Sequence, residues 1–416
     1  MTTSKRAKAV LEIRPPEPER DRASMVDLAE RVSSAGNLGH YGFVEHCRKG
    51  YIDGSAYDWR SSVIGLVGGE VVTHYGVWRY AMRVGRAGLV AGGIGAVGTA
   101  GSYRDQGFMA RTATESLALM RANGYHVSVL FGIRDFYHRF GYVRAWNDES
   151  YIVAVADLPT PSRAPGARPL QIRAPITAAT WRLLGELYNA EYAGLTGTAV
   201  RPTYTANRFP ELSCFVWPSV SRPHGYVLLK RSGQECLCWE SIGEPERALG
   251  AARFVEERWG CKRVRFEFTH HLHPVTAALR RGEARRETEF HANSGPLICL
   301  LDLQGALRTL CPELGRRLEQ SEYRDWIGRI SVKEGEAACT LQIARSHVRV
   351  LDEGAGRTAT DGSVLGSGAL VQLLIGTDEP AEIVAGGGVA LRGPARDLAA
   401  ALFPAQRPSM SLWDRF

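Results

Sequence analysis

The pattern of apolar and polar positions predicts a strand, a turn, a helix and a second strand in the first third of the chain. Residues 88–99 are apolar and glycine-rich without a helical period, which is typical of a strand, and the polar residues 100–106 are typical of a turn. Residues 107–123 predict a helix that stops at a glycine, and residues 126–131 predict another apolar strand. Because the turn precedes a helix, free N–H groups and the helix dipole make it a candidate anion site.

The same pattern extends this unit on both sides and ends it at a linker. Residues 61–66 and 70–83 predict a hairpin, and residues 151–156 predict the last strand of the unit. Residues 158–169 hold four prolines, which predicts a linker and assigns the first domain to residues 1–157. The other elements predicted here are a strand at 11–14 and helices at 21–33 and 43–51.

Two further units follow the linker. Residues 170–302 repeat the order of the first unit, but Glu244 and Glu246 stand where the turn would be, and their carboxylates would repel a pyrophosphate. Residues 303–416 change character, with short alternating segments and fewer long helices, which predicts a third unit. The elements predicted in the second unit are a helix at 177–192, a hairpin at 224–230 and 235–240, a helix at 244–259 and a strand at 263–268, and those in the third include a helix at 367–375 and a strand at 389–392.

Two motifs in the first unit carry a family resemblance. Arg104-Asp-Gln-Gly107-Phe-Met109 resembles the acetyl-CoA turn of the GNAT acetyltransferases, and Phe136-Tyr137-His-Arg-Phe140-Gly141-Tyr142 resembles the later aromatic segment of that family. Met109 replaces a smaller residue, as in the Eis-type (enhanced intracellular survival) branch. The resemblance implies an α/β fold class with mixed sheets. The fold that the resemblance implies consists of tandem GNAT folds, of which the second is degenerate, and a C-terminal sterol-carrier-protein-like α+β domain.

The resemblance also implies acetyl-CoA as co-substrate and a set of binding residues. Val97 and Thr99 would pair with the pantetheine arm, and the turn would hold the pyrophosphate, although Arg104 alone is also compatible with a surface charge. Segments around His40, Tyr41, Phe43 and Trp78 would border the acceptor cleft, although for each residue taken alone a place in the core or at the rim is favoured. The full set of cofactor-binding residues implied is Val97, Gly98, Thr99, Arg104, Asp105, Gln106, Gly107, Phe108 and Met109.

Acetyl transfer from a thioester to an amine needs a group that takes the ammonium proton and one that protonates the thiolate. The resemblance implies Tyr137 as general acid, and the alternative is that its ring only packs. It implies the terminal carboxylate of Phe416 as general base, and the alternative is a frayed end. Arg415 precedes Phe416 where related polyspecific enzymes carry an acidic residue, which disfavours polycationic acceptors unless Asp414 supplies that charge.

Composition and charge favour a globular protein that handles an anion. The chain has 416 residues, 44% of them hydrophobic, and a formal net charge of +7. Its basic residues are spread out, and the densest cluster, at 280–286, is interrupted by a glutamate, which favours a solvated face over a nucleic-acid patch. Eight cysteines without a C-x-x-C pair favour buried thiols in a reducing compartment. Without a signal peptide or a long apolar run, a cytoplasmic protein that binds no membrane is expected.

The expected partner is a primary amine, on a small molecule such as an aminoglycoside-like compound or on a lysine side chain. The resemblance implies direct attack in a ternary complex, no metal, and a homo-oligomer between dimer and hexamer. A rival hypothesis is a non-catalytic protein that binds acetyl-CoA or a lipid. The G-x-G-x-x-G at 93–98 lies inside a predicted strand, which disfavours a dinucleotide site, and the histidines at 270–273 favour a polar turn over a metal site.

Overall fold

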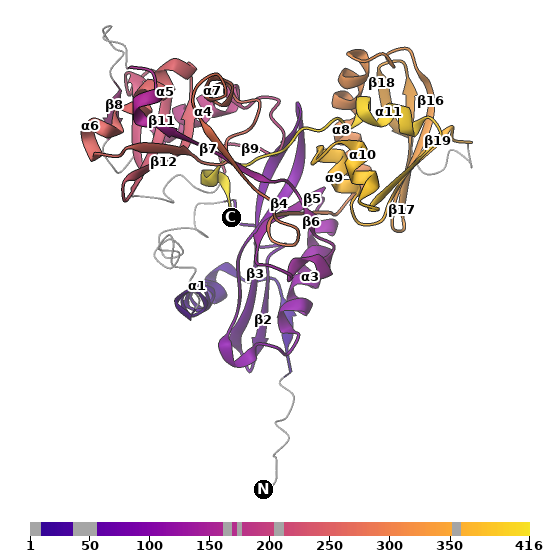
Figure 1. Ribbon diagram of the computed structural model, residues 1–416. Coiled ribbons are helices and arrows are strands. Elements are labelled where there is room, and N and C mark those ends of the chain that lie inside the picture. Colours follow the sequence, from indigo (N-terminus) through magenta and orange to yellow (C-terminus); the bar gives the residue numbers. More distant parts are fainter. Residues whose placement is uncertain (1–9, 36–55, 161–168, 173–176, 204–211, 352–358) are drawn as a thin grey trace.

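The computed structural model describes residues 10–35, 56–160, 169–172, 177–203, 212–351 and 359–416. These residues form three sheets, each with helices packed on it, and the first sheet lies between the other two (Figure 1). None of the described helices is long and apolar enough to span a bilayer. The predicted helix at 43–51 falls outside the described residues.

The first sheet is built around the long β3–β4 hairpin, and its strand order is β1-β2-β3-β4-β5-β15-β6, with β9 paired to β3. Helix α3 packs on this sheet through Met109, Ala113, Leu117 and Met120, which are buried at helical spacing. The predicted hairpin, the central strand and the helix that follows it are confirmed. The elements are β1 (Glu12–Arg14), α1 (Pro18–Ala35), β2 (Val63–Val67), β3 (Glu70–Val84), β4 (Ala87–Thr99), α3 (Phe108–Ala122), β5 (Val127–Gly132), β6 (Val143–Arg144), β9 (Ala199–Val200) and β15 (Gly295–Leu300).

The second sheet has the order β14-β7-β13-β12-β11-β10-β8. Strands β12 and β13 pair in parallel, and helices α5 and α6 connect them along the chain. Strands β4 and β5 of the first sheet pair in the same way and are connected by α3. The helix predicted at 244–259 is divided into α5 and α6 at Phe254. The elements are β7 (Asp148–Ala154), β8 (Leu170–Ile172), α4 (Ala178–Glu191), β10 (Ser213–Pro218), β11 (Pro223–Ser232), β12 (Glu235–Ile242), α5 (Pro245–Arg253), α6 (Val255–Trp259), β13 (Arg263–Phe266), α7 (Pro274–Leu279) and β14 (Arg285–Glu289).

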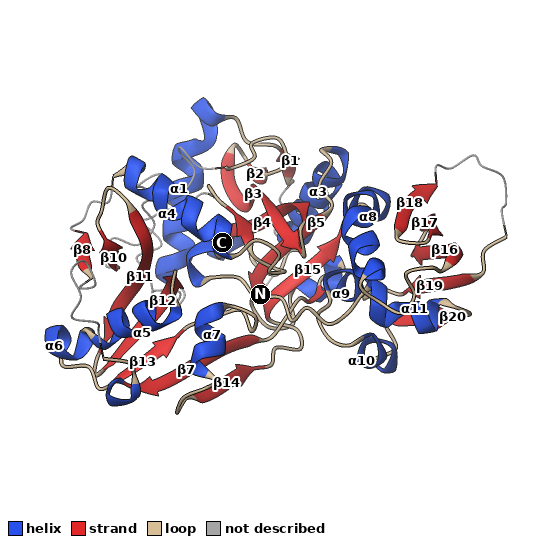
Figure 2. Cartoon of the chain, turned by 90° about the horizontal axis from the view of Figure 1, so that it is seen from above, coloured by secondary structure: helices blue, strands red, loops and turns tan. Residues whose placement is uncertain are grey.

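The first two sheets exchange a strand. Residues 151–154 of the segment predicted as the last strand of the first unit, 151–156, belong instead to β7, which lies between β13 and β14 of the second sheet. In return β15, from the end of the second unit, lies between β5 and β6 of the first sheet (Figure 2). The predicted domain borders at 157 and 302 therefore do not separate the two sheets, because the first unit contributes β7 to the second sheet and the second unit contributes β9 and β15 to the first.

The third sheet, of order β18-β17-β16-β19-β20, is joined to the first by helix α8. Leu303, Leu307 and Leu310 of α8 belong to one apolar cluster that runs from Met82 and Val129 into the third sheet. This continuous core ties the third unit to the first. The elements are α8 (Leu303–Glu319), β16 (Ile327–Glu334), β17 (Ala337–Ala344), β18 (His347–Leu351), β19 (Gly362–Gly366), α9 (Leu370–Ile375), α10 (Pro380–Ala385), β20 (Val389–Arg392) and α11 (Ala395–Leu402).

After α11 the chain leaves the third sheet and crosses to the second, where it ends beside the first (Figure 1). We call residues 404–416 the C-terminal tail. Its anchor is a buried ion cluster: the Arg201 guanidinium donates to Asp414 at 2.9 Å and to Glu240 at 2.6 Å, and both carboxylate side chains are fully buried. Ser411 Oγ donates to the same Glu240 at 3.0 Å, and the Trp413 ring stacks on Trp181 at 5.0 Å.

Replacing Arg201 by Met should destabilise the protein strongly. The change leaves Asp414 and Glu240 as buried carboxylates without their shared cation, which costs about 3–5 kcal/mol in comparable sites. Urea unfolding of Arg201→Met against the wild type measures this cost. Arg201→Lys is the matched variant: it keeps the charge but loses the bidentate fork, so we expect an intermediate value. A loss below about 1 kcal/mol in Arg201→Met, the range of an exposed pair, would contradict the anchoring role.

Candidate functional site

The centre of the candidate site is the gap where β4 and β5 part. The two strands pair in parallel only from Ala91 to Ile94, opposite Val127 to Leu130. Strand β4 continues to Thr99 and β5 continues to Gly132 without pairing to each other. Strand β15 pairs with β5 on its other side and β3 pairs with β4, so both strands that border the gap keep a partner.

A bulge lies in β4 beside this gap. The β3–β4 register runs from Gly76 opposite Gly95 to His74 opposite Gly98, so two residues of β4, Ala96 and Val97, stand opposite the single residue Tyr75 of β3. Ala96 has a positive φ of 47°, which is rare outside glycine and marks a locally strained backbone. His74 supports the bulge from β3: its Nδ1 lies 2.8 Å from the Ala96 carbonyl oxygen, and its Nε2 lies 2.8 Å from the Tyr57 hydroxyl.

The predicted anion-binding turn lies between the end of β4 and α3. Arg104, Asp105, Gln106 and Gly107 are all exposed. Asp105 and Gly107 have positive φ values of 59° and 74°, and Gly107 is the N-cap of α3 with no side chain covering the helix end. The first N–H groups of this helix therefore face an open turn, the arrangement that binds phosphate groups.

The remaining cofactor residues predicted from the sequence divide between the strand and the helix core. Val97 and Thr99 are half-buried and Gly98 is buried on β4 next to the gap. The Phe108 and Met109 side chains point into the core rather than into the turn, with 6% and 9% of their surface exposed. These two residues are available to a ligand only through their backbone.

Tyr137 lies on the opposite side of the gap, on a short 3-10 helix (Tyr137–Phe140) after β5. Its ring contacts Phe136 at a centroid distance of 4.9 Å and approaches Gly132 so closely that an added Cβ there would come within 2.5 Å of it. Burial raises the pKa of the Tyr137 phenol to about 12, so it carries its proton at neutral pH. No hydrogen bond joins its hydroxyl to the described residues, which leaves the proton available to a ligand.

The last residue of the sequence lies against β4 at the start of the gap. Its ring lies over Gly93, where an added Cβ would come within 2.1 Å of ring atoms of Phe416. Tyr80, two residues beyond Trp78 on β3, contacts the same ring at 5.0 Å. Because Trp78 stands directly opposite Gly93 in the β3–β4 ladder, Trp78, Tyr80 and Phe416 lie on one face of the sheet.

The acceptor residues predicted from the sequence are placed only in part. His40, Tyr41 and Phe43 lie outside the described residues. Trp78 is fully buried, with its ring 5.0 Å from Tyr57, and it belongs to the apolar cluster against which Phe416 packs. It therefore forms the floor beneath the tail rather than an exposed wall of a cleft.

Sequence reasoning missed four residues of this site: Tyr57, His74, Tyr80 and Gly93. A signal for two of them was present, since His74, Gly76, Trp78 and Tyr80 recur at every second position and share one face of β3. Gly76 leaves room between its neighbours, because a Cβ there would come within 2.8 Å of both the His74 and Trp78 rings.

The charges next to Phe416 are neutralised within the protein. Arg415 donates to both oxygens of Asp148, at 2.6 and 2.9 Å, and its guanidinium lies 3.8 Å from the Phe268 ring centroid. Asp414 is held by Arg201 and also accepts from Thr203 at 3.0 Å. Both side chains are therefore paired within the protein, and whether either one sets the charge of an acceptor pocket stays a prediction.

Two other sequence patterns have structural roles. The His273 imidazole accepts from Val275 N–H at 3.3 Å and caps α7, and His270 accepts from Leu272 N–H at 3.1 Å, as expected of a polar turn. The glycines of the 93–98 motif lie inside β4, and no helix begins at the third one.

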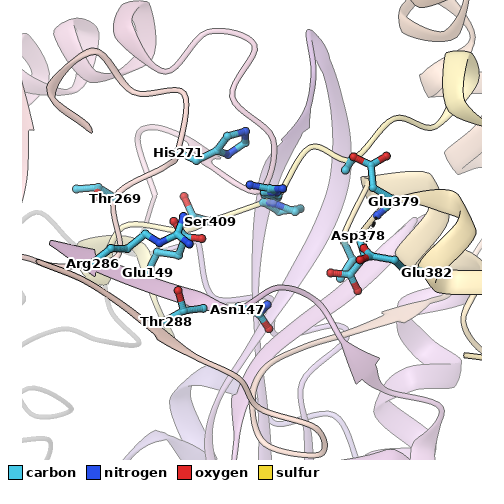
Figure 3. A pocket seen from close by; sticks show the side chains of 14 residues that line it. Asn147, Glu149, Thr269, His271, Arg286, Thr288, Asp378, Glu379, Glu382 and Ser409 are labelled. Carbon is cyan, nitrogen blue, oxygen red and sulfur yellow. Dashed lines mark hydrogen bonds between the residues drawn. The ribbon is translucent and has the colours of Figure 1, made fainter. Parts of the chain in front are cut away.

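A polar cavity of about 280 Å³ lies where the second sheet, α10 and the C-terminal tail meet (Figure 3). Arg286, Glu149 and Thr269 gather on one side of it, and Asp378 and Glu382 on the other. No residue of β4 or β5 lines it, so it is separate from the gap. Arg286, Glu379, Glu382 and Arg407 are exposed, and solvent satisfies such groups.

Comparison with known proteins agrees with this geometry. Residues 40–145 match the family described as acetyltransferase (GNAT) domain, so the chain carries an acetyltransferase domain and is an acyltransferase. This match includes β4, the turn, α3, β5 and Tyr137. No curated protein matches the sequence of this chain.

Solved structures share the fold over nearly the whole chain. A GCN5-related N-acetyltransferase from Kribbella flavida matches with a TM-score of 0.70 and 18% identity, covering 98% of this chain and 99% of its own. One from Anabaena variabilis matches with a TM-score of 0.72 and 14% identity over 98% and 100%. Eis1 from Mycobacterium abscessus matches with a TM-score of 0.65 and 14% identity over 98% and 100%. At these identities the likeness concerns the fold.

Placing a methyl group at residue 93 should displace the tail. The Cβ of Gly93→Ala would overlap the Phe416 ring, whereas Gly88→Ala, on the same strand, would meet only the Ala81 Cβ at 3.8 Å. We expect Gly93→Ala to lose about 1–3 kcal/mol of unfolding free energy and Gly88→Ala to stay within about 0.5 kcal/mol of the wild type. Carboxypeptidase digestion followed by mass spectrometry should release Phe416 faster from Gly93→Ala only. Equal release from both variants would refute the docked position.

The buried histidine should make stability depend on pH. Desolvation lowers the pKa of His74 from 6.5 to about 4, so between these values the unfolded chain binds a proton that the folded chain does not. Stability due to neutral His74 is complete above pH 6.5 and is lost as the pH falls towards 4.

Urea unfolding across that window measures this loss. His270 and His271, whose pKa values are also lowered by burial, contribute in the same direction. The loss of stability on acidification should be smaller in His74→Leu by about 3 kcal/mol. An identical loss in the variant and the wild type would contradict the prediction.

Proposed function

We propose that this protein is an N-acetyltransferase that moves the acetyl group of acetyl-CoA to a primary amine by direct attack in a ternary complex. The observation that carries the proposal is the packing of Phe416 against Gly93, at the point where β4 and β5 part. In this proposal the terminal carboxylate of Phe416 lies beside the gap and serves as the base, and the position of the Phe416 ring at Gly93 supports this.

The first sheet supplies the cofactor site in this proposal. The pantetheine arm lies in the gap along Val97 and Thr99, where it takes the place that a neighbouring strand would have. The pyrophosphate lies over the turn from Arg104 to Gly107, bound by the first N–H groups of α3 and by the guanidinium. In the second sheet, Glu244 and Glu246 stand at the start of α5, and their charge disfavours a second pyrophosphate there.

The two groups that transfer protons in this proposal, Phe416 and Tyr137, lie on different sides of the gap. The amine nitrogen attacks the thioester carbonyl carbon, and the carbonyl π electrons move to its oxygen, which accepts from a backbone N–H at the bulge. Collapse of this intermediate breaks the carbon–sulfur bond. The Phe416 carboxylate takes the proton lost by the amine, and the Tyr137 phenol gives its proton to the CoA thiolate.

The acceptor in this proposal is a primary amine on a small molecule, of the aminoglycoside type among others, or on a lysine side chain. Asp148 neutralises Arg415 in an ion pair, so Arg415 does not repel a polycationic acceptor in this proposal. We also infer that the second sheet is a GNAT-like fold without a cofactor site, that the third unit is sterol-carrier-like, and that the protein forms homo-oligomers. The parallel β12–β13 pair around α5 supports the first of these inferences.

Removing the Tyr137 hydroxyl should abolish most of the activity while leaving the fold intact. Loss of a general acid costs about 10²–10⁴-fold in kcat, and acetyl-CoA affinity should stay within about threefold because the turn is unchanged. CoA release with a panel of amines measures the first quantity, and calorimetry measures the second. Tyr125→Phe, which loses a buried hydroxyl bonded to Asp58 at 2.6 Å outside the gap, is the control and should keep its rate.

The terminal carboxylate is tested by moving it. Deletion of Phe416 and addition of one glycine after it should each lower kcat by about 10²-fold or more, because both displace the base. If the deletion variant binds acetyl-CoA and acetylates amines at the wild-type rate, the assignment of the base is refuted. If the wild type binds acetyl-CoA but no amine accelerates CoA release, the binding-protein hypothesis replaces the proposed function.

A further inference from the structure

A single peptide group connects His74 to the proposed reaction. The Ala96 carbonyl and the Val97 N–H belong to one planar trans peptide, so they point in opposite directions. His74 Nδ1 lies 2.8 Å from the Ala96 oxygen and holds that carbonyl on the β3 side. The Val97 N–H is thereby directed away from His74. Rotation of this peptide would turn the Val97 N–H out of this direction.

A second hydrogen bond selects the tautomer that makes this contact possible. Because the Ala96 oxygen only accepts, Nδ1 must carry the proton, and Nε2 must then accept from the Tyr57 hydroxyl 2.8 Å away. The chain of donors runs from Tyr57 through the imidazole to Ala96. A hydrogen bond to a peptide carbonyl also polarises the peptide and strengthens its N–H as a donor.

The position of His74 favours this role over simple filling of the core. The imidazole is 2% exposed, and burial lowers its pKa to about 4, so it is neutral at working pH. Burying it has a desolvation cost that an apolar side chain of similar size would avoid. Both ring nitrogens are satisfied, and one of the two bonds reaches the strained residue of the bulge, whose φ is 47°.

We propose that His74 is a positioning residue for acetyl transfer: it holds the Ala96–Val97 peptide so that the Val97 N–H faces the thioester oxygen. The inference rests on the proposed function, and it adds a residue that never touches substrate. His74 acts on the charge that develops in the transition state, so it contributes to kcat and leaves acetyl-CoA binding unchanged.

The kinetic test compares three variants with the wild type. His74→Leu removes the donor, His74→Asn restores one because its amide nitrogen replaces Nδ1, and Thr73→Val is the control. Thr73 is the neighbouring residue on β3, and its hydroxyl bonds to Thr112 at 2.7 Å on the other face of the strand, so the control loses a buried hydrogen bond without touching the bulge.

We expect His74→Leu to lower kcat about 10-fold to 100-fold with acetyl-CoA affinity unchanged, His74→Asn to recover part of this loss, and Thr73→Val to keep its kcat. The shape of the pH–rate profile should be the same in His74→Leu as in the wild type, because His74 exchanges no proton with substrate. Loss of one limb of the profile, or equal losses in His74→Leu and Thr73→Val, would overturn the proposal.

A crystal structure of His74→Leu separates this inference from the proposed function. The Ala96–Val97 peptide should rotate in the variant and return to its original orientation in His74→Asn, whether or not any amine is acetylated. A peptide that stays in place in His74→Leu overturns the positioning role. Failure of every amine in the wild type would instead remove the proposed function while the peptide result still holds.

Discussion

Three buried charged side chains fix the position of the last residue, Phe416, in the fold. Asp414 and Glu240 would be costly to bury alone, and Arg201 compensates both with one planar guanidinium. Asp414 is two residues before Phe416, and two extended residues span at most about 7 Å. Arg415, between them, is fixed by Asp148. The last residue therefore has little freedom, and its place on β4 is determined by the second sheet.

The two sheets use one topological device for different purposes. In each, a parallel strand pair around a helix separates near its C-terminal end: β4 beyond Ile94 and β12 beyond Cys238. The first gap is the centre of the candidate site. At the second, the tail contacts Glu240 of β12 and, through Arg415, Phe268 just after β13. The strand ends that would border a cofactor in one sheet hold the tail in the other, which gives the second sheet a role in the proposed site without chemistry of its own.

Local pattern was sufficient to predict the elements of the gap but not their partners. Strand β4, the turn, α3 and the helix of Tyr137 follow from periodicity and motif. The exchange of β7 and β15 does not, because an apolar strand has the same pattern whichever sheet it joins, and pairing is decided by residues far away in sequence. For His74, the alternation of β3 predicts the face on which the side chain lies but not its role, because a histidine on that face cannot be distinguished from a core residue until its hydrogen-bond partners are known.

The glycines of β4 show why a motif needs its structural context. The G-x-G-x-x-G at 93–98 has the spacing of a dinucleotide fingerprint, yet packing against the strand accounts for its first and third glycines, Gly93 and Gly98, and for the neighbouring Gly92. A Cβ at Gly93 would meet the tail, and one at Gly98 would come within 3.2 Å of Val32 of α1. On the opposite face, a Cβ at Gly92 would come within 2.1 Å of Met120 of α3. A strand so poor in side chains packs weakly on its own. Its pairing with β3 over nearly its whole length supplies the order that its own side chains do not, while the edge of β4 that faces β5 stays unpaired beyond Ile94.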